Sequence, residues 1–311
     1  DEGESDNRQV RQLLIYAKEM DNFTIGSEDS GEASAKWVNI DFDYHIFGFV
    51  FDKKTVLNYR LKEDGVVTLQ MVQPTTTFNG YFLYAKKNYD QLKKIGDNLD
   101  LTVDFGMLAI IAIPILRGLQ YFYTWVPNYG VAIIFLTLLL RLVTFPLQYK
   151  SFKSMKKMQV VQPQLAKLRE KYKDDPPRMQ KETMALFKSA GANPLGGCFP
   201  LLLQMPIFFA FYQVLYNAVE LVGAPFAGWI VDLSIKDPFY VLPVLMGVSF
   251  FFQSRLNPST SADPTQKKLM MFMPLIFCFI MKDLPAGLNL YITVSTLLGI
   301  FQQLFVYKMA D

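Results

Sequence analysis

Apolar residues gather in five long runs in the second half of the chain: 129–148, 199–222, 239–252, 269–281 and 287–307. A helix needs about 20 residues to cross a hydrocarbon core about 30 Å thick. The first, second and fifth runs reach that length, whereas the third and fourth, with 14 and 13 residues, are short. Because full-length runs flank the short pair, we interpret all five as membrane spans, the short ones crossing a locally thinned bilayer. Two buried helices of a soluble core are the alternative.

Basic residues in the connecting loops give this arrangement an orientation. Residues 150–190 hold 11 Lys and Arg against four Asp and Glu, and every second loop after them is again positive. Basic loops stay in the cytoplasm. We therefore expect the N-terminal region outside, and the loops 150–198 and 253–268 and the C-terminal residues 308–311 in the cytoplasm.

A further apolar segment, residues 105–124, precedes the first run and is interrupted by Pro114 and Arg117. A crossing here would invert the charge pattern of the loops. We therefore expect residues 105–128 to form a helix that lies along the outer membrane face; a sixth span is the alternative.

The N-terminal part, residues 1–104, has the pattern of a β-rich domain. Residues 37–84 are expected to form strands, and Lys62-Glu63-Asp64-Gly65 lies between residues 57–61 and 66–72 as the turn of a hairpin. A helix is expected within residues 86–99. Residues 1–36 are polar and acidic, and we expect about half of them to be mobile or incompletely folded. We also expect further sequence to precede Asp1, because no signal or anchor segment opens the chain.

The basic loop has the pattern of a helical hairpin over residues 150–192. Its first helix has an apolar stripe, and Asp175 precedes Pro176-Pro177 as the N-cap of the second helix. Gly191 suits the end of that helix. The Lys-rich face can contact anionic lipid or dock RNA or a ribosome, and both remain open; no signature of an RNA-binding module accompanies it.

Composition and charge exclude several classes of site. Residues 1–104 hold 18 acidic and 12 basic residues, a net −6, and residues 105–311 hold 10 acidic and 19 basic residues, a net +9. With one His and two Cys, the chain has too few ligands for a zinc site of Cys and His and too few cysteines for a disulfide-stapled domain. The scarcity of His also leaves a Ser or Cys nucleophile without its usual base. No Walker-type loop is present. We expect no cofactor, no metal and no enzymatic activity.

One residue in the first run is costly to place in a membrane. Arg141 is the thirteenth of 20 residues, only about 4 Å from the middle, where an arginine costs about 2.5–3.5 kcal/mol. It shares a helix face with Thr137, Thr144 and Gln148. The other runs hold neutral polar groups and no Asp or Glu in their middle: Gln204, Tyr212, Asn217, Ser249, Gln253, Asn289, Thr293, Ser295, Thr296, Gln302 and Gln303. These groups either line a wet cavity that suits an acidic or hydrophilic peptide, or join helices while Arg141 reaches the headgroups.

Several motifs together resemble the YidC/Oxa/Alb family of membrane protein insertases, in its Gram-negative form with a truncated periplasmic domain. They are 193–206 (NPLGGCFPLLLQMP), Ala224-Pro225-Phe226, Trp229, Asp232-Leu233, Asp237-Pro238, Tyr240, Leu242-Pro243, Asp263-Pro264, Pro285-Ala286-Gly287-Leu288 and 99–106 (LDLTVDFG). The resemblance covers residues 99–308, and residues 37–98 look like the end of that family's periplasmic β-sandwich.

The resemblance implies a polytopic α-helical membrane protein. It implies a five-span insertase core over residues 129–307, the cytoplasmic hairpin 150–192 and a partial periplasmic β-sandwich. It also implies a hydrophilic groove open to the cytoplasm and closed outside. Arg141 matches the groove arginine and Thr137 a substrate-contacting threonine; Gln204, Met205, Pro206 and Phe208 match a stretch that contacts nascent chains. Tyr291 matches the first of two tyrosines, and Ile292 replaces the second. With Thr144 and Thr293 from the polar faces, these are the expected substrate-binding residues.

The expected function is that of an insertase and chaperone in the bacterial inner membrane. It would move short hydrophilic segments across the membrane and transmembrane helices into it, without nucleotide hydrolysis. The expected partners are nascent membrane proteins, the Sec translocon, ribosomes at the cytoplasmic loops, and membrane lipids. We expect no sequence-specific binding of nucleic acid. A small-molecule or ion transporter is the alternative, although no inverted repeat with broken helices is visible. An intramembrane hydrolase would need paired Asp or a Ser with a base at depth, which the sequence lacks.

Overall fold

The computed structural model describes residues 12–42, 44–72, 79–191, 199–256, 272 and 276–309. The chain divides into two compact units. The first comprises Asp1–Gly106 with Asn217–Glu220, and the second comprises Met107–Tyr216 with Leu221–Asp311.

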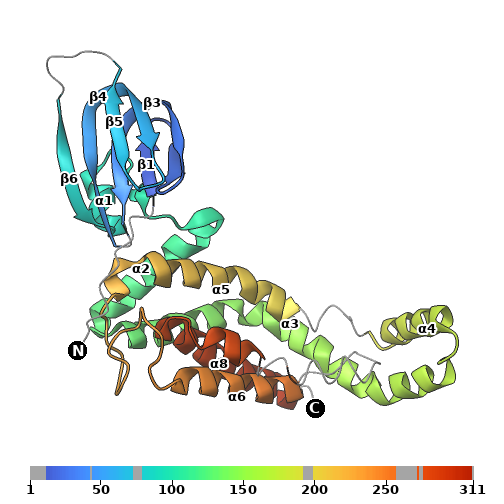
Figure 1. Ribbon diagram of the computed structural model, residues 1–311. Helices are drawn as coiled ribbons and strands as arrows, with labels where there is room; N and C mark the ends of the chain where they lie inside the picture. Colours follow the sequence, from blue (N-terminus) through green and yellow to red (C-terminus); the bar gives the residue numbers. More distant parts are fainter. Residues whose placement is uncertain are drawn as a thin grey trace. The chain divides into compact units, whose positions relative to one another are not determined.

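The first unit is built on a six-stranded antiparallel sheet (Figure 1). Its strands are β1 (Gln12–Tyr16), β2 (Met20–Thr24), β3 (Asp29–Asp41), β4 (His45–Leu61), β5 (Val67–Met71) and β6 (Gly80–Lys86). The order is β2-β1-β3-β4-β5, and β6 pairs with β4. The long strand β4 thus organises the sheet, because β3 follows most of its length and β6 and β5 pair with its two halves.

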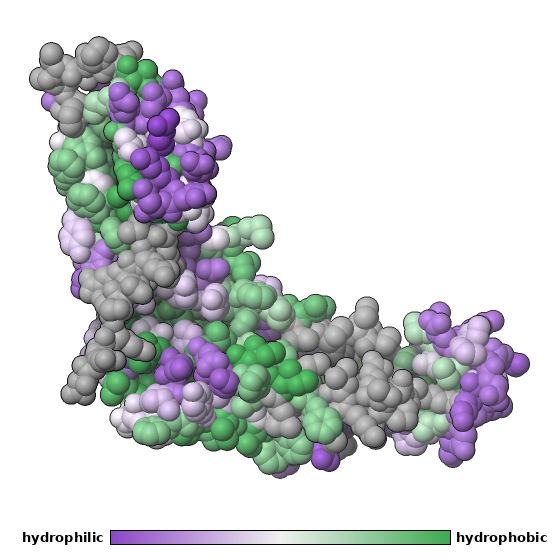
Figure 2. Space-filling view, in the orientation of Figure 1, coloured by the Kyte–Doolittle hydropathy of each residue, from purple (hydrophilic) through white to green (hydrophobic). Residues whose placement is uncertain are grey.

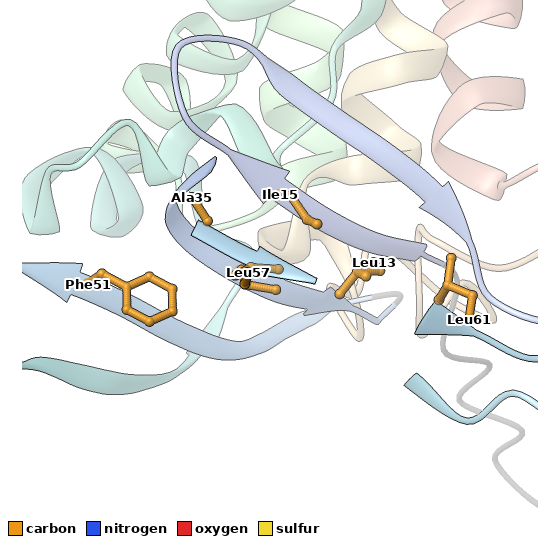
Figure 3. Packing of buried hydrophobic residues seen from close by; sticks show 7 residues of the cluster. Leu13, Ile15, Ala35, Phe51, Leu57 and Leu61 are labelled. Atoms are coloured by element: carbon orange, nitrogen blue, oxygen red, sulfur yellow. The ribbon is translucent and has the colours of Figure 1, made fainter. Parts of the chain in front are cut away.

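An apolar core lies on one face of this sheet. The register between β3 and β4 shifts between Ala35 and Trp37, and such a bulge bends the paired strands. Figure 3 shows members of the resulting cluster, in which side chains from β1, β3 and β4 pack together: Leu13, Ile15, Ala35, Val38, Phe51, Leu57 and Leu61.

On the opposite face, Tyr16 and Trp37 contact the turn between α1 (Tyr89–Ile95) and the short helical turn η1 (Leu99–Thr102). Trp37 stacks on Tyr16, and its indole Nε1 donates to the carbonyl of Asp97 at 2.9 Å. Lys87 and Asp41 form a buried ion pair at 2.8 Å. Both faces of the sheet are therefore covered near β1 and the second half of β3.

The expected hairpin is confirmed, since Leu61 of β4 pairs with Val67 of β5 across the turn at Lys62–Gly65. The helix expected within residues 86–99 is α1. By contrast, β1, β2 and the start of β3 lie within residues 12–36, ahead of the segment 37–84 in which we expected strands; of residues 1–36 we expected about half to be mobile or incompletely folded. Leu13, Leu14 and Ile15 are buried on both faces and show no alternation, which is why the pattern did not reveal β1. Residues 1–11 lie outside the described residues.

The second unit is helical. Its helices are α2 (Ala109–Trp125), α3 (Tyr129–Lys171), α4 (Pro176–Ser189), α5 (Phe199–Asn217, whose last residue belongs to the first unit), α6 (Val241–Leu256) and α8 (Ala286–Met309). Residues 276–281 are helical as well, whereas residues 269–271 and 273–275 of the fourth apolar run lie outside the described residues. Within the described part of the chain, three helical segments are long and apolar enough to cross a membrane: Gly106–Trp125, Tyr129–Leu168 and Ala286–Met309.

The last helix, α8, buries polar side chains together with apolar ones and exposes several large apolar side chains. Its buried side chains include polar ones, whereas Leu297, Phe301, Leu304 and Phe305 are exposed. Figure 2 shows hydrophobic residues over much of the helical unit's visible surface. Exposed apolar side chains around a polar interior are the arrangement expected of a helix bundle in lipid.

The expected hairpin is present, but its first arm is not a separate helix. A single helix of 43 residues, α3, includes the first apolar run and continues through Pro146 and Pro163 to Lys171. Asp175 caps α4 by accepting from the backbone N–H of Arg178, as expected. Met158 and Leu165 of α3 pack against Phe187 of α4, and Figure 2 shows hydrophilic residues gathered at this end.

Candidate functional site

Arg141 lies midway along the first apolar run and contacts α8. Its Nε and Nη2 donate to the hydroxyl of Ser295 at 3.0 and 2.8 Å, and its Nη1 donates to Oε1 of Gln148 at 3.0 Å. Gln302 of α8 donates to the backbone carbonyl of Arg141 at 3.1 Å. Both the side chain and the backbone of this residue are thus joined to neutral polar groups.

A polar side chain of α5 extends this network. Nε2 of Gln204 donates to the hydroxyl of Tyr291 and, at 3.3 Å, to that of Ser295. The ring of Tyr291 is stacked on Phe211 of α5, with centroids 4.0 Å apart. Three helices far apart in sequence, α3, α5 and α8, therefore bring Arg141, Gln204, Tyr291 and Ser295 together.

The three expected threonines have their hydroxyls bonded within their own helices. Thr137 donates to the carbonyl of Ile133, Thr144 to that of Leu140, and Thr293 to that of Asn289, each four residues back. This pattern is common for threonine in helices. Thr144 also accepts from Nε2 of Gln148 and so joins the network, whereas Thr137 and Thr293 are buried beside it.

The remaining expected residues lie on α5 outside the hydrogen-bonded network. Met205 is 41% exposed, and Pro206 and Phe208 are half-buried. Pro206 lies within the helix. These three give α5 an accessible apolar surface next to Gln204, but whether a client contacts them stays a prediction.

The charge of Arg141 is not balanced by a carboxylate in the described part of the chain, where no ion pair to it occurs. The helices α3, α5, α6 and α8 hold no Asp or Glu along the segments 129–148, 199–217, 241–256 and 286–309. A guanidinium stays charged under all ordinary conditions, and neutral hydroxyl and amide groups compensate its desolvation only in part. The site is therefore electropositive. No group of His, Cys, Asp and Glu suited to a metal occurs among the described residues.

A loop at the opposite end of α3 from the hairpin is bound to the starts of α3 and α8. Asn128 caps α3 and donates to the carbonyl of Phe226 at 2.8 Å. The backbone N–H groups of Ala286 and Gly287 donate to the carbonyls of Ile235 and Leu233.

Gly130 makes the close approach of this loop possible, since a Cβ there would lie 2.0 Å from the ring of Phe226. Asp237, fully buried in the same loop, accepts from Nε1 of Trp229 at 2.9 Å. It also accepts from the backbone N–H of Leu242 at 2.8 Å and from that of Phe239 at 3.1 Å.

Two contributors to the site were not selected from the sequence. Ser295 was one of many polar residues in the last run, yet it is the residue that Arg141 contacts twice. Its position four residues after Tyr291 places both on one face of α8, and this spacing was the available signal. Phe211 gave no signal, because an aromatic residue in an apolar run is most simply read as packing.

The sequence of the helical unit decides the family. Residues 121–311, more than half of the chain, match the model of the 60Kd inner membrane protein family. The chain belongs to this family. The 60Kd inner membrane protein assignment confirms the resemblance seen in the motifs, and with the apolar helices it indicates a bacterial inner-membrane protein.

Relatives with curated names agree with the 60Kd inner membrane protein assignment. A protein of Aeromonas hydrophila, named membrane protein insertase YidC, is 50% identical over 225 residues, which is 72% of this chain and 41% of the relative. A protein of Citrifermentans bemidjiense with the same name is 39% identical over 304 residues, 94% of this chain and 56% of the relative. The chain thus spans about half the length of the curated relatives it matches.

A solved structure shares the fold. It is titled "Active YidC insertase crystal structure with the first transmembrane domain resolved", and it superposes with a TM-score of 0.55 at 21% identity. The match covers 93% of this chain and 78% of the other. It supports the architecture of an antiparallel sheet followed by a helical membrane part, which is the coarse form of the expected fold.

Proposed function

We propose that the chain acts as a membrane protein insertase and chaperone. It would move short hydrophilic segments of nascent membrane proteins across the inner membrane and release their apolar helices into the lipid. The observation that supports this best is the network around Arg141. A permanent charge, held at mid-span by neutral groups of α3 and α8 and linked through Ser295 to Gln204 of α5, offers a polar client segment an intermediate stop inside the membrane.

The driving force in this proposal is the transfer of the client's apolar helix into lipid, about 0.8 kcal/mol per buried CH₂. The polar groups of α3, α5 and α8 lower the barrier, because they replace part of the hydration of the polar segment. Nucleotide hydrolysis and a cofactor have no part in this scheme.

The site residues divide by role in the proposal. Arg141 and Gln204 offer donors to the client's polar segment, the buried Tyr291 holds Gln204 from α8, and Thr144 holds Gln148 beside Arg141. Thr137 and Thr293 add polarity to the groove wall. Met205, Pro206 and Phe208 form the apolar surface of α5 along which the client helix would pass into lipid.

The proposed groove opens to the cytoplasm and is closed outside. The contacts that bind residues 226–237 to the starts of α3 and α8 support the closed outer end. We propose five spans, with the sheet unit and this loop outside and the α3–α4 hairpin and the C-terminal residues 308–311 in the cytoplasm. The 16 residues of α6 reach only about 24 Å, which supports a thinned bilayer beside the groove.

Partners follow from this orientation. The basic hairpin would contact anionic lipid headgroups and the ribosome, and the Sec translocon would deliver larger clients sideways. Contact with ribosomal RNA would be through charge and not through base sequence.

A photo-crosslinking experiment tests the proposal. The photoreactive phenylalanine analogue benzoylphenylalanine replaces Phe208 of the full chain in proteoliposomes, and a radiolabelled single-span client is synthesised in their presence. We expect crosslinks to the client from position 208 and crosslinks only to lipid from position 301, where Phe301 is 70% exposed on α8.

Client crosslinks that are absent at position 208, or equal at both positions, would contradict the proposal. Solute or ion flux through the same proteoliposomes, without client insertion, would favour a transporter instead.

A further inference from the structure

The guanidinium of Arg141 occupies a notch in α8 that depends on a glycine. A Cβ at Gly299 would lie 3.1 Å from Nη1, 3.2 Å from Nη2 and 3.3 Å from Cζ of Arg141. Such distances are shorter than ordinary van der Waals contacts. The charged end of Arg141 therefore fits against α8 because residue 299 has no side chain.

Ser295 forms the other wall of the notch. It precedes Gly299 by four residues and so lies on the same helix face, one turn away. Its hydroxyl accepts from Nε and Nη2 of Arg141 while Gly299 leaves room for Nη1. Gln302, one further turn along, holds the backbone carbonyl of Arg141. These three residues of α8 thus determine where the guanidinium lies along the helix and which way its N–H groups point.

Among the described residues, not every N–H donor of this guanidinium has an acceptor. Arginine has five N–H donors, and three are accounted for by Ser295 and Gln148 within the described part of the chain. The remaining donors suit a carboxylate, which arginine can bind with two parallel hydrogen bonds.

We propose that Gly299 is a specificity-determining positioning residue. By seating Arg141 in the notch, it sets where the unused N–H donors point and so favours client segments that bear carboxylates. A side chain at residue 299 would push the guanidinium away from α8 and weaken recognition of acidic segments more than that of neutral ones. This inference rests on the proposed function.

The test compares two clients that differ only in the charge of their translocated tail. One tail carries two Asp and the other two Asn, and insertion into proteoliposomes is measured as protection from protease. The measured quantity is the inserted fraction of the Asp client divided by that of the Asn client, the Asp-to-Asn ratio. Relative to the unmodified chain, we expect Gly299→Val to lower this ratio about tenfold, because one charge-assisted hydrogen bond to the client is lost. Gly299→Ala, a smaller change, is expected to lower it less.

Two controls separate positioning from packing. Gly247 of α6 is as tightly enclosed, since a Cβ there would lie 3.2 Å from Cβ of Cys278, but the nearest atoms belong to no arginine. Gly247→Val should therefore leave the Asp-to-Asn ratio unchanged. In an Arg141→Ala background the crowding group is gone, and Gly299→Val should have no further effect on the ratio.

Each result decides a point. An unchanged ratio in Gly299→Val, or an equal drop of the ratio in the Arg141→Ala background, would overturn the role of Gly299 and leave the proposed function standing. Failure of the unmodified chain to insert either client would overturn both. Thermal unfolding of Gly299→Ala and Gly299→Val confirms that the variants compared are folded.

Discussion

At the scale of single residues, two charged side chains of the helical unit differ in how they are compensated. Asp237 is fully buried and accepts three hydrogen bonds, two from backbone N–H groups and one from the indole of Trp229. Arg141 is held by neutral side chains, and among the described residues its hydrogen bonds account for three of its five donors. Asp237 therefore serves the fold, whereas we propose that Arg141 serves a ligand.

Removing the Asp237 carboxylate should destabilise the loop of residues 226–237. Asp237→Ala leaves the Trp229 indole and the N–H groups of Phe239 and Leu242 without their acceptor, so we expect a loss of about 2–4 kcal/mol, measured by thermal unfolding in detergent micelles. Asp232→Ala is the matched control, because Asp232 accepts only from the backbone N–H and hydroxyl of Ser234 among the hydrogen bonds of the described residues. Equal effects of the two substitutions would contradict this assignment.

At the scale of elements, the span and the hairpin share one helix. The 43 residues of α3 extend about 65 Å, roughly twice the thickness of the hydrocarbon core, so its second half must project beyond the lipid. The returning helix α4 is held to it by a small apolar cluster, of which Phe187 is the buried member from α4. The hairpin is thus a local unit whose closure depends on few side chains.

Truncating that side chain should release α4 without affecting the bundle. We expect Phe187→Ala to cost about 3 kcal/mol and to expose residues 176–189 to limited proteolysis and fast amide exchange. Met184→Ala, at a position 55% exposed on the same helix, should change neither. Protection that is unchanged in Phe187→Ala, or faster exchange that spreads through α8, would show that the hairpin is not a separate unit.

At the scale of the whole molecule, the orientation of α2 decides whether the sheet unit and the loop at residue 227 lie on the same side of the membrane. If α2 lies along the outer face, as we propose, the sheet unit and the loop at residue 227 share one side. If α2 crosses, as its length and composition also allow, they lie on opposite sides.

Single-cysteine labelling in right-side-out vesicles distinguishes the two cases. Cys198 and Cys278 are first replaced by Ser, and Thr68, Ala227 or Ser189, all exposed, is then changed to Cys. We expect a membrane-impermeant maleimide to label positions 68 and 227 from outside, and position 189 only after lysis. Labelling of positions 68 and 227 from opposite sides would establish a sixth crossing.

Much of this organisation could be predicted from local sequence, and its gaps have physical causes. The β4–β5 hairpin and the Asp175 cap follow from turn and capping residues that act within a few positions. The strand β1 could not be predicted in this way. Its successive side chains, among them Leu14, are buried on both faces of the sheet, so the alternation of apolar and polar residues that marks a strand is missing. The contact between Arg141 and Ser295, 154 residues apart, depends on how α3 and α8 are rotated against each other, which no local pattern contains.

Because α3 is continuous, the first arm of the hairpin and Arg141 lie on the same helix. Lys171, the last residue of α3, lies 30 residues after Arg141, about 45 Å away by helical rise. A tilt of about 10° pivoting at Arg141 would sweep the far end through about 8 Å. Under the proposed orientation, a partner bound to the hairpin would therefore act on the same helix that holds Arg141, through a backbone in which Pro146 and Pro163 each lack one N–H donor.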